Sequence, residues 1–136
     1  KQLLSTIKTT NKIINVTGSV FAKENDFQNC LLLNTDKNVI EALNGNIFML
    51  IGNKLITTAL SEGCLNGIIR KQILKIAKKI ENIEVIEGVI SPFDLQKADE
   101  LFITNVIVGI QPITKYRKKE FTSNLAIELN VKLNAL

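Results

Sequence analysis

The chain of 136 residues is long enough for one domain with a hydrophobic core, and 46% of its residues are hydrophobic, which excludes an intrinsically disordered chain. The net charge is only +4, and no stripe of basic and aromatic residues favours nucleic acid as a partner. No apolar run approaches the roughly 18 residues of a membrane span. The segment contains no histidine, which excludes a Ser-His-Asp triad, a Cys-His pair and a histidine-ligated metal.

The two cysteines, Cys30 and Cys64, are too few and too far apart for a disulfide framework or a zinc site. Cys30 stands in an apolar run, and we expect it in the core. This cysteine usage is typical of a reducing compartment and predicts a cytoplasmic protein. Without histidine, any proton transfer near neutral pH must be carried out by Lys, Tyr, Cys or carboxylate side chains.

The first half of the chain alternates between helical and extended patterns. After the sequence IKTTN, apolar residues at roughly helical spacing predict a helix over residues 11–25. Apolar runs bounded by turn residues predict strands over 30–34 and 39–42. The sequence NIFMLI-GN-KLITT predicts a β-hairpin with strands over 46–51 and 54–58.

The second half begins with an apolar stripe at helical spacing, which predicts an amphipathic helix over 68–81. A strand is expected over 83–90, and the sequence SPFD after it is typical of a capped helix start. A long apolar strand is expected over 100–110, whole or broken near its asparagine, and a final helix over 122–133.

The basic run KYRKK, residues 115–119, is interpreted as a solvated loop rather than a binding patch. No internal repeat or low-complexity segment is present. The pattern therefore predicts one α+β domain with mixed β-sheets and flanking helices.

The sequence CLNGIIR places Gly67, Ile68 and Ile69 where a helix begins, without a capping side chain. The first turn of a helix presents unpaired N–H groups and a partial positive charge. A glycine at this point lets a ligand approach the backbone closely. A phosphate site is one interpretation, and an ordinary loop-to-helix turn is the other.

Two charged residues are candidates for chemistry. Glu41 lies in an otherwise apolar strand, where a carboxylate is costly unless it is paired with a cationic ring nitrogen or a lysine. Asn46, at the start of the next strand, could orient such a site. Lys8 is either solvated or, if its amine is desolvated, able to form a Schiff base. A phosphate cradle, a carboxylate for a pyridinium and a lysine for an aldehyde are what pyridoxal phosphate needs.

The sequence IEALNGNIFMLIGNKLITTALSEGCLNGIIR resembles the signature of the class IV aminotransferases, which are fold type IV pyridoxal-phosphate enzymes. The family includes branched-chain aminotransferase, D-amino-acid aminotransferase and aminodeoxychorismate lyase. Upstream, IKTTN is similar to the lysine segment of the family, and downstream ADELFITNVIVGIQPIT resembles the next strand and loop. The resemblance implies that residues 1–136 form the large, cofactor-binding C-terminal domain of the D-amino-acid-aminotransferase-like fold, with the N-terminal small domain outside this chain.

The resemblance also implies roles for individual residues. Lys8 would hold the cofactor and carry the proton, and Glu41 would keep the pyridinium nitrogen protonated. Leu65 would pack on the ring, the backbone N–H groups of the Ile68–Ile69 turn would hold the phosphate, and Arg70 would enter an ion pair instead. The implied cofactor-binding set is Lys8, Glu41, Asn46, Leu65, Gly67, Ile68, Ile69, Asn105 and Val106.

Two positions bear on affinity and reaction. Ile69 stands where many relatives have a threonine whose hydroxyl also touches the phosphate. Asn105 is similar to the lyases, whereas branched-chain enzymes have Gly-Thr-Ala in this loop. The sequence therefore favours an aminodeoxychorismate lyase, which eliminates pyruvate and gives p-aminobenzoate for folate biosynthesis. A branched-chain or D-amino-acid aminotransferase and an isolated non-catalytic domain are the alternatives. All enzymatic readings take a small amino substrate, and the family implies a homodimer.

Overall fold

The computed structural model describes residues 20, 23–24 and 29–136. Lys8 and most of the helix expected over 11–25 lie outside the described residues. Within that segment, Val20, Lys23 and Glu24 are helical and exposed. Across the described part of the chain, no helix is long and apolar enough to cross a membrane.

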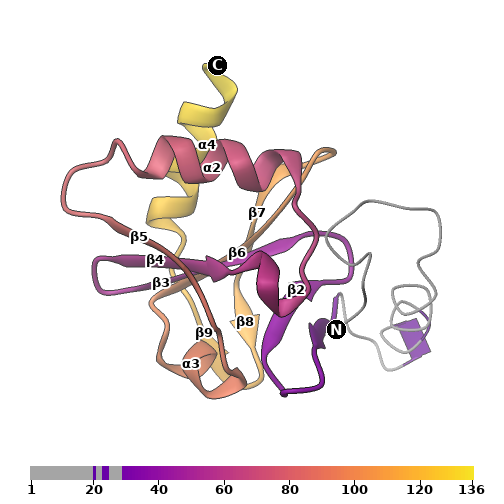
Figure 1. Ribbon diagram of the computed structural model, residues 1–136. Coiled ribbons are helices and arrows are strands. Elements are labelled where there is room, and N and C mark those ends of the chain that lie inside the picture. The colour runs from indigo at the N-terminus through magenta and orange to yellow at the C-terminus, as the bar shows by residue number, and fades with distance from the viewer. Residues whose placement is uncertain (1–19, 21–22, 25–28) are drawn as a thin grey trace.

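A five-stranded mixed sheet in the order β5-β4-β3-β6-β7 forms the centre of the structure (Figure 1). Strands β3 and β6 pair antiparallel at its middle, whereas β5 lies parallel to β4 at one edge. The strands span Asn46–Ile51 (β3), Lys54–Thr58 (β4), Glu84–Gly88 (β5), Glu100–Asn105 (β6) and Gly109–Ile113 (β7). The expected hairpin over 46–51 and 54–58 is present with these bounds.

Two smaller antiparallel pairs flank the central sheet. Strand β1, Leu31–Leu33, pairs with β2, Val39–Ala42, which contains Glu41. Strands β8, Lys115–Tyr116, and β9, Lys119–Glu120, form a short hairpin where a loop was expected over 115–119. The turn of this hairpin places Arg117 at a φ of 54°.

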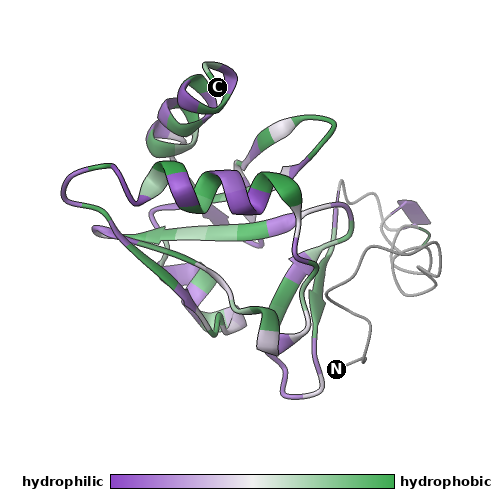
Figure 2. Cartoon of the chain, turned by 45° about the horizontal axis from the view of Figure 1, so that its top comes forward, coloured by the Kyte–Doolittle hydropathy of each residue, from purple (hydrophilic) through white to green (hydrophobic). Residues whose placement is uncertain are grey.

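Helices cover both faces of the central sheet because successive β3 residues point to opposite sides. Phe48 and Leu50 pack against α2, Ile68–Ala77, and α4, Asn124–Asn134. Ile47 and Met49 pack on the other face, with α3, Pro92–Lys97. Figure 2 shows hydrophobic residues along the central strands and mixed hydrophobic and hydrophilic residues around α2 and α4. The mixed sheet with flanking helices confirms the predicted α+β class.

Some expected boundaries differ from those in the structure. Helix α2 ends at Ala77 rather than at residue 81, because the chain turns at Asn82, which has a φ of 67°, to bring β5 alongside β4. The strand expected over 83–90 is only Glu84–Gly88, which is the length over which it pairs with β4. The run expected over 100–110, whole or broken near its asparagine, is broken there, because β6 ends at Asn105 and the antiparallel β7 begins at Gly109. Cys30, expected in the core, is only half-buried.

Candidate active site

A cavity of about 320 Å³ lies where the turn after β2, the loop before α2 and the end of β6 meet. Eight of the nine residues predicted to bind a cofactor line it, and the ninth, Lys8, lies outside the described residues. These eight are Glu41, Asn46, Leu65, Gly67, Ile68, Ile69, Asn105 and Val106. Residues from three separate segments of the sequence therefore share one cavity wall.

The first turn of α2 forms one part of this wall. Its N-cap is Gly67, and no side chain caps the helix. Within the described part of the chain, the backbone N–H groups of Ile68 and Ile69 have no hydrogen-bond acceptor. A helix N-terminus in this state offers donors and a partial positive charge to an anion. The expected uncapped helix is thus present at the cavity.

Glu41 supplies the only charged side chain among the described residues that line the cavity. It lies in β2 and is 8% exposed. A carboxylate in this position attracts a cationic group on a ligand. The site therefore combines one carboxylate with a helix N-terminus that favours an anion.

Two polar side chains lie opposite each other on the floor of the cavity. Asn46 in β3 and Thr104 in β6 are paired across the antiparallel ladder, so their side chains share one face. Asn46 donates from Nδ2 to the carbonyl of Leu65 at 2.6 Å. The hydroxyl of Thr104 is buried without a partner among the described residues. Its register opposite Asn46 is the signal that could have placed Thr104 at the site.

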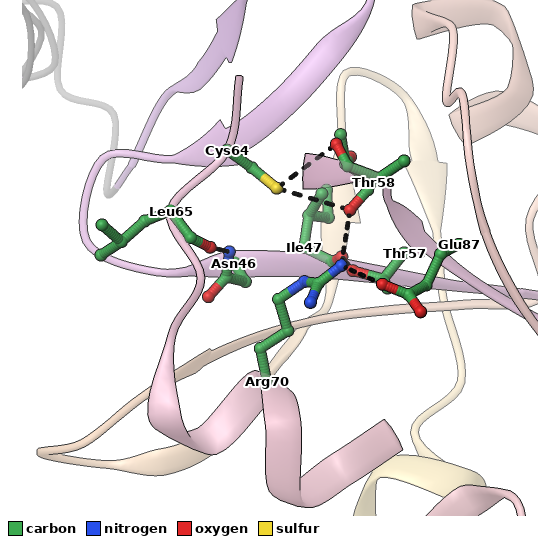
Figure 3. Close-up of polar contacts among 9 residues, drawn as sticks. Asn46, Ile47, Thr57, Thr58, Cys64, Leu65, Arg70 and Glu87 are labelled. Carbon is green, nitrogen blue, oxygen red and sulfur yellow. Dashed lines mark hydrogen bonds and ion pairs between the residues drawn. The ribbon is translucent and has the colours of Figure 1, made fainter. Parts of the chain in front are cut away.

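Behind the cavity, the Thr58 carbonyl at the end of β4 accepts hydrogen bonds from the loop before α2 and from α2 itself (Figure 3). Arg70 donates from Nη2 to this carbonyl at 3.1 Å and to Glu87 at 2.7 Å, and it is 2% exposed. The expected ion pair of Arg70 is confirmed. Cys64 donates to the same carbonyl at a sulfur–oxygen distance of 3.4 Å. The loop from Cys64 to Gly67 is thus held at its beginning and at the helix that follows.

Cys64 is an unsuitable nucleophile. Burial raises the pKa of its thiol to about 11, the charge of Arg70 opposes this shift, and the charge of Glu41 adds to it. The thiol is therefore neutral near pH 7, and nucleophiles act as thiolates. Among the described residues, no group of three Cys, Asp or Glu side chains could hold a metal ion.

The turn between β6 and β7 is closed by the side chain of Asn105. Its Oδ1 accepts hydrogen bonds from the backbone N–H groups of Ile107 and Val108, each at 3.0 Å. Val106 and Ile107 are exposed at this turn, and Val106 lines the cavity. The structure thus gives Asn105 a definite role in shaping the turn beside the cavity.

Comparison with known proteins gives a consistent answer. The family described as amino-transferase class IV matches residues 1–116. A Thermotoga maritima protein named as a probable branched-chain-amino-acid aminotransferase is 35% identical over 112 residues, which are 81% of this chain and 41% of that protein.

Two solved structures share the fold. The branched-chain amino acid aminotransferase of Thermobaculum terrenum, in its PLP form, superposes with a TM-score of 0.91 at 26% identity, over 97% of this chain and 45% of that one. A candidate 4-amino-4-deoxychorismate lyase of Legionella pneumophila gives a TM-score of 0.89 at 24% identity, over 96% and 49% of the two chains.

The chain thus spans somewhat less than half the length of these relatives. The family match extends through every segment that lines the cavity. The chain belongs to the class IV aminotransferases, whose members are enzymes that work with pyridoxal phosphate.

Proposed function

We propose that this chain is the cofactor-binding domain of a pyridoxal-phosphate enzyme that acts on a small amino substrate. The observation that carries the proposal is the meeting of Glu41, Leu65 and the uncapped first turn of α2 in one cavity. A volume of about 320 Å³ is within the range of small-molecule sites. The remaining part of the site would come from the part of the protein outside this chain.

The donor set fits the cofactor. The N–H groups of Ile68 and Ile69 suit a phosphate, because they are unpartnered among the described residues and lie at the positive end of a helix. The Glu41 carboxylate suits a protonated ring nitrogen, and the half-buried Leu65 offers an apolar contact for the ring. The phosphate, the ring nitrogen and the ring face of pyridoxal phosphate therefore each have a matching group in the cavity.

When bound, pyridoxal phosphate supplies an electron-accepting ring that stabilises negative charge on the carbon next to the substrate amine. Glu41 would keep the ring nitrogen protonated, which preserves that capacity. Lys8 would remove the proton at that carbon and, in a transamination, would return it to the carbon of the cofactor's aldehyde group. The first turn of α2 would hold the phosphate and so fix the ring over the floor of the cavity.

Aminodeoxychorismate lyase is the reaction we favour. Asn105 supports it, since asparagine at this loop resembles the lyases. In this reaction Lys8 removes a proton, the substrate expels pyruvate, and its ring aromatises to p-aminobenzoate. A branched-chain or D-amino-acid aminotransferase is the second candidate, supported by the 35% identity to the Thermotoga protein. There Lys8 would return the proton, and hydrolysis would give a keto acid.

Product assays on the full-length protein separate these reactions. With aminodeoxychorismate as substrate, we expect equal amounts of pyruvate and p-aminobenzoate, and Lys8→Ala should abolish both. A keto acid formed from an amino acid, without p-aminobenzoate, would establish the aminotransferase instead. If added pyridoxal phosphate keeps the absorbance of the free cofactor and no Lys8-dependent absorbance appears, the domain is non-catalytic.

A homodimer and a cytoplasmic location complete the proposal. The homodimer rests on the resemblance to the family, and the location rests on the free cysteines Cys30 and Cys64. Light scattering on the full-length protein gives its mass directly. A monomeric mass would overturn the dimer.

A further inference from the structure

We propose that Asn46 is a positioning residue, which determines where the backbone N–H groups of Ile68 and Ile69 in the first turn of α2 lie. By the same proposal, position 67 is glycine because the Asn46 side chain, rather than a ligand, needs the space of a Cβ. This inference rests on the proposed cofactor site. It assigns to Asn46 no contact with the cofactor. Asn46 would act through the loop that joins Leu65 to the first turn of α2.

The hydrogen bond of Asn46 is short and shielded from solvent. Asn46 is 4% exposed, and its Nδ2 donates to the Leu65 carbonyl at 2.6 Å. Figure 3 shows the Leu65 carbonyl turned toward Asn46 and the Leu65 side chain turned away from it. The bond therefore fixes the orientation of the side chain that would contact the ring.

The other end of the Asn46 amide explains Gly67. The backbone of Gly67 has φ −67° and ψ 150°, a conformation open to any residue, so its geometry does not require glycine. A Cβ at this position would collide with Oδ1 of Asn46. The nearest atom outside Asn46 is the Cβ of Arg70 at 3.8 Å, an ordinary contact. A side chain at position 67 therefore requires the Asn46 amide, which is held by its bond to the Leu65 carbonyl, to move.

These contacts link the two parts of the site. Glu41 and Asn46 stand at either end of a tight turn that is closed by a 2.8 Å hydrogen bond from Ala42 N–H to the Gly45 carbonyl. Through its bond to the Leu65 carbonyl, Asn46 also holds the loop that leads into α2. The position of this loop determines where the N–H groups in the first turn of α2 lie. Asn46 thereby sets the spacing between the Glu41 carboxylate and those N–H groups.

A double-mutant cycle tests the steric part. The dissociation constant of pyridoxal phosphate is measured for the full-length protein and for Gly67→Ala, Asn46→Ala and the double variant. We expect Gly67→Ala to weaken binding at least about tenfold in the native background, since a collision must displace the loop. In the Asn46→Ala background, the same change should alter binding by no more than about twofold.

A second pair of variants tests the hydrogen bond. Asn46→Asp keeps the side-chain shape but removes the donor, and we expect about tenfold weaker binding and a shifted absorbance of the bound cofactor. Thr57→Val is the matched control, because the Thr57 hydroxyl donates a buried 2.6 Å bond to the Ile47 carbonyl away from the cavity. This control should lower thermal stability and leave cofactor affinity unchanged.

The outcomes are separable. An equal effect of Gly67→Ala in both backgrounds would show that the glycine serves the ligand, and it would overturn the inference. Native affinity and absorbance in Asn46→Asp would overturn it as well. If the native protein binds no pyridoxal phosphate, the proposed function fails. The same cycle, measured by urea unfolding of the apoprotein, still decides whether Asn46 and Gly67 are coupled.

Discussion

Strand β6 begins with a buried carboxylate that serves a helix far along the chain. Glu100 is 4% exposed, and it accepts hydrogen bonds from the N–H groups of Leu125 at 2.9 Å and Ala126 at 3.2 Å. Ser123, the N-cap of α4, makes no side-chain cap bond. Glu100 therefore caps α4 from the neighbouring sheet.

The substitution Glu100→Gln keeps the shape of this side chain and removes its charge. One oxygen becomes an amide that faces an N–H donor, so one hydrogen bond to a charged group, worth about 1.5–3 kcal/mol, is lost. Loss of the negative charge at a helix N-terminus removes roughly 0.3–1 kcal/mol more. We expect a net loss of about 2–4 kcal/mol, or a fall of about 6–16 °C in melting temperature for a domain of this size.

Urea unfolding followed by circular dichroism measures this loss. The matched control is Glu128→Gln, which changes an exposed carboxylate of the same helix. We expect the control to alter the free energy of unfolding by no more than about 0.5 kcal/mol. If Glu100→Gln differs from the control by less than that amount, the capping argument is wrong.

Three further predictions concern the surroundings of the site. Glu87→Gln leaves the Arg70 charge buried without its ion pair and should cost about 1–2 kcal/mol in urea unfolding, less than a fully buried pair because Glu87 is 42% exposed. Gly45→Ala places a Cβ 2.5 Å from the Thr104 carbonyl and should lower the free energy of unfolding by about 1–3 kcal/mol. Burial raises the pKa of the Cys64 thiol from 9.0 to about 11. The neutral buried thiol therefore adds to the free energy of unfolding below pH 9, and this contribution is lost as the pH rises toward 11. The melting temperature of the native protein should therefore fall more steeply over this range than that of Cys64→Ala.

Local signals were sufficient for the elements that local contacts stabilise. The hairpin of β3 and β4 was predicted with its bounds, since turn residues separate two apolar runs. The sequence SPFD predicted a capped helix, and Ser91 and Asp94 do form reciprocal capping bonds. In both cases the residues that decide the structure lie within a few positions of each other.

Non-local pairing decided what the sequence pattern missed. Ile80 continues the apolar spacing of α2, but the chain must already turn there. The turn allows the backbone N–H of Glu84 to donate to the Asn53 carbonyl at the start of the pairing between β5 and β4. By contrast, the sequence left open whether the run over 100–110 is broken near Asn105, and a local contact decides the turn after β6. Its closure depends on the Asn105 side chain, which the composition of the turn does not reveal.

Eight of the cavity residues were predicted from the sequence through the resemblance to the family, but Thr104 and the reason for Gly67 were not. A glycine before a helix is explained equally well by a ligand or by a neighbouring side chain. Only the fold shows that Asn46, 21 positions earlier, fills the space that a Cβ would need. The distinction has a consequence for affinity. Because Ile68 and Ile69 offer no hydroxyl, the first turn of α2 can hold a phosphate only through backbone N–H groups, whose placement we propose depends on Asn46.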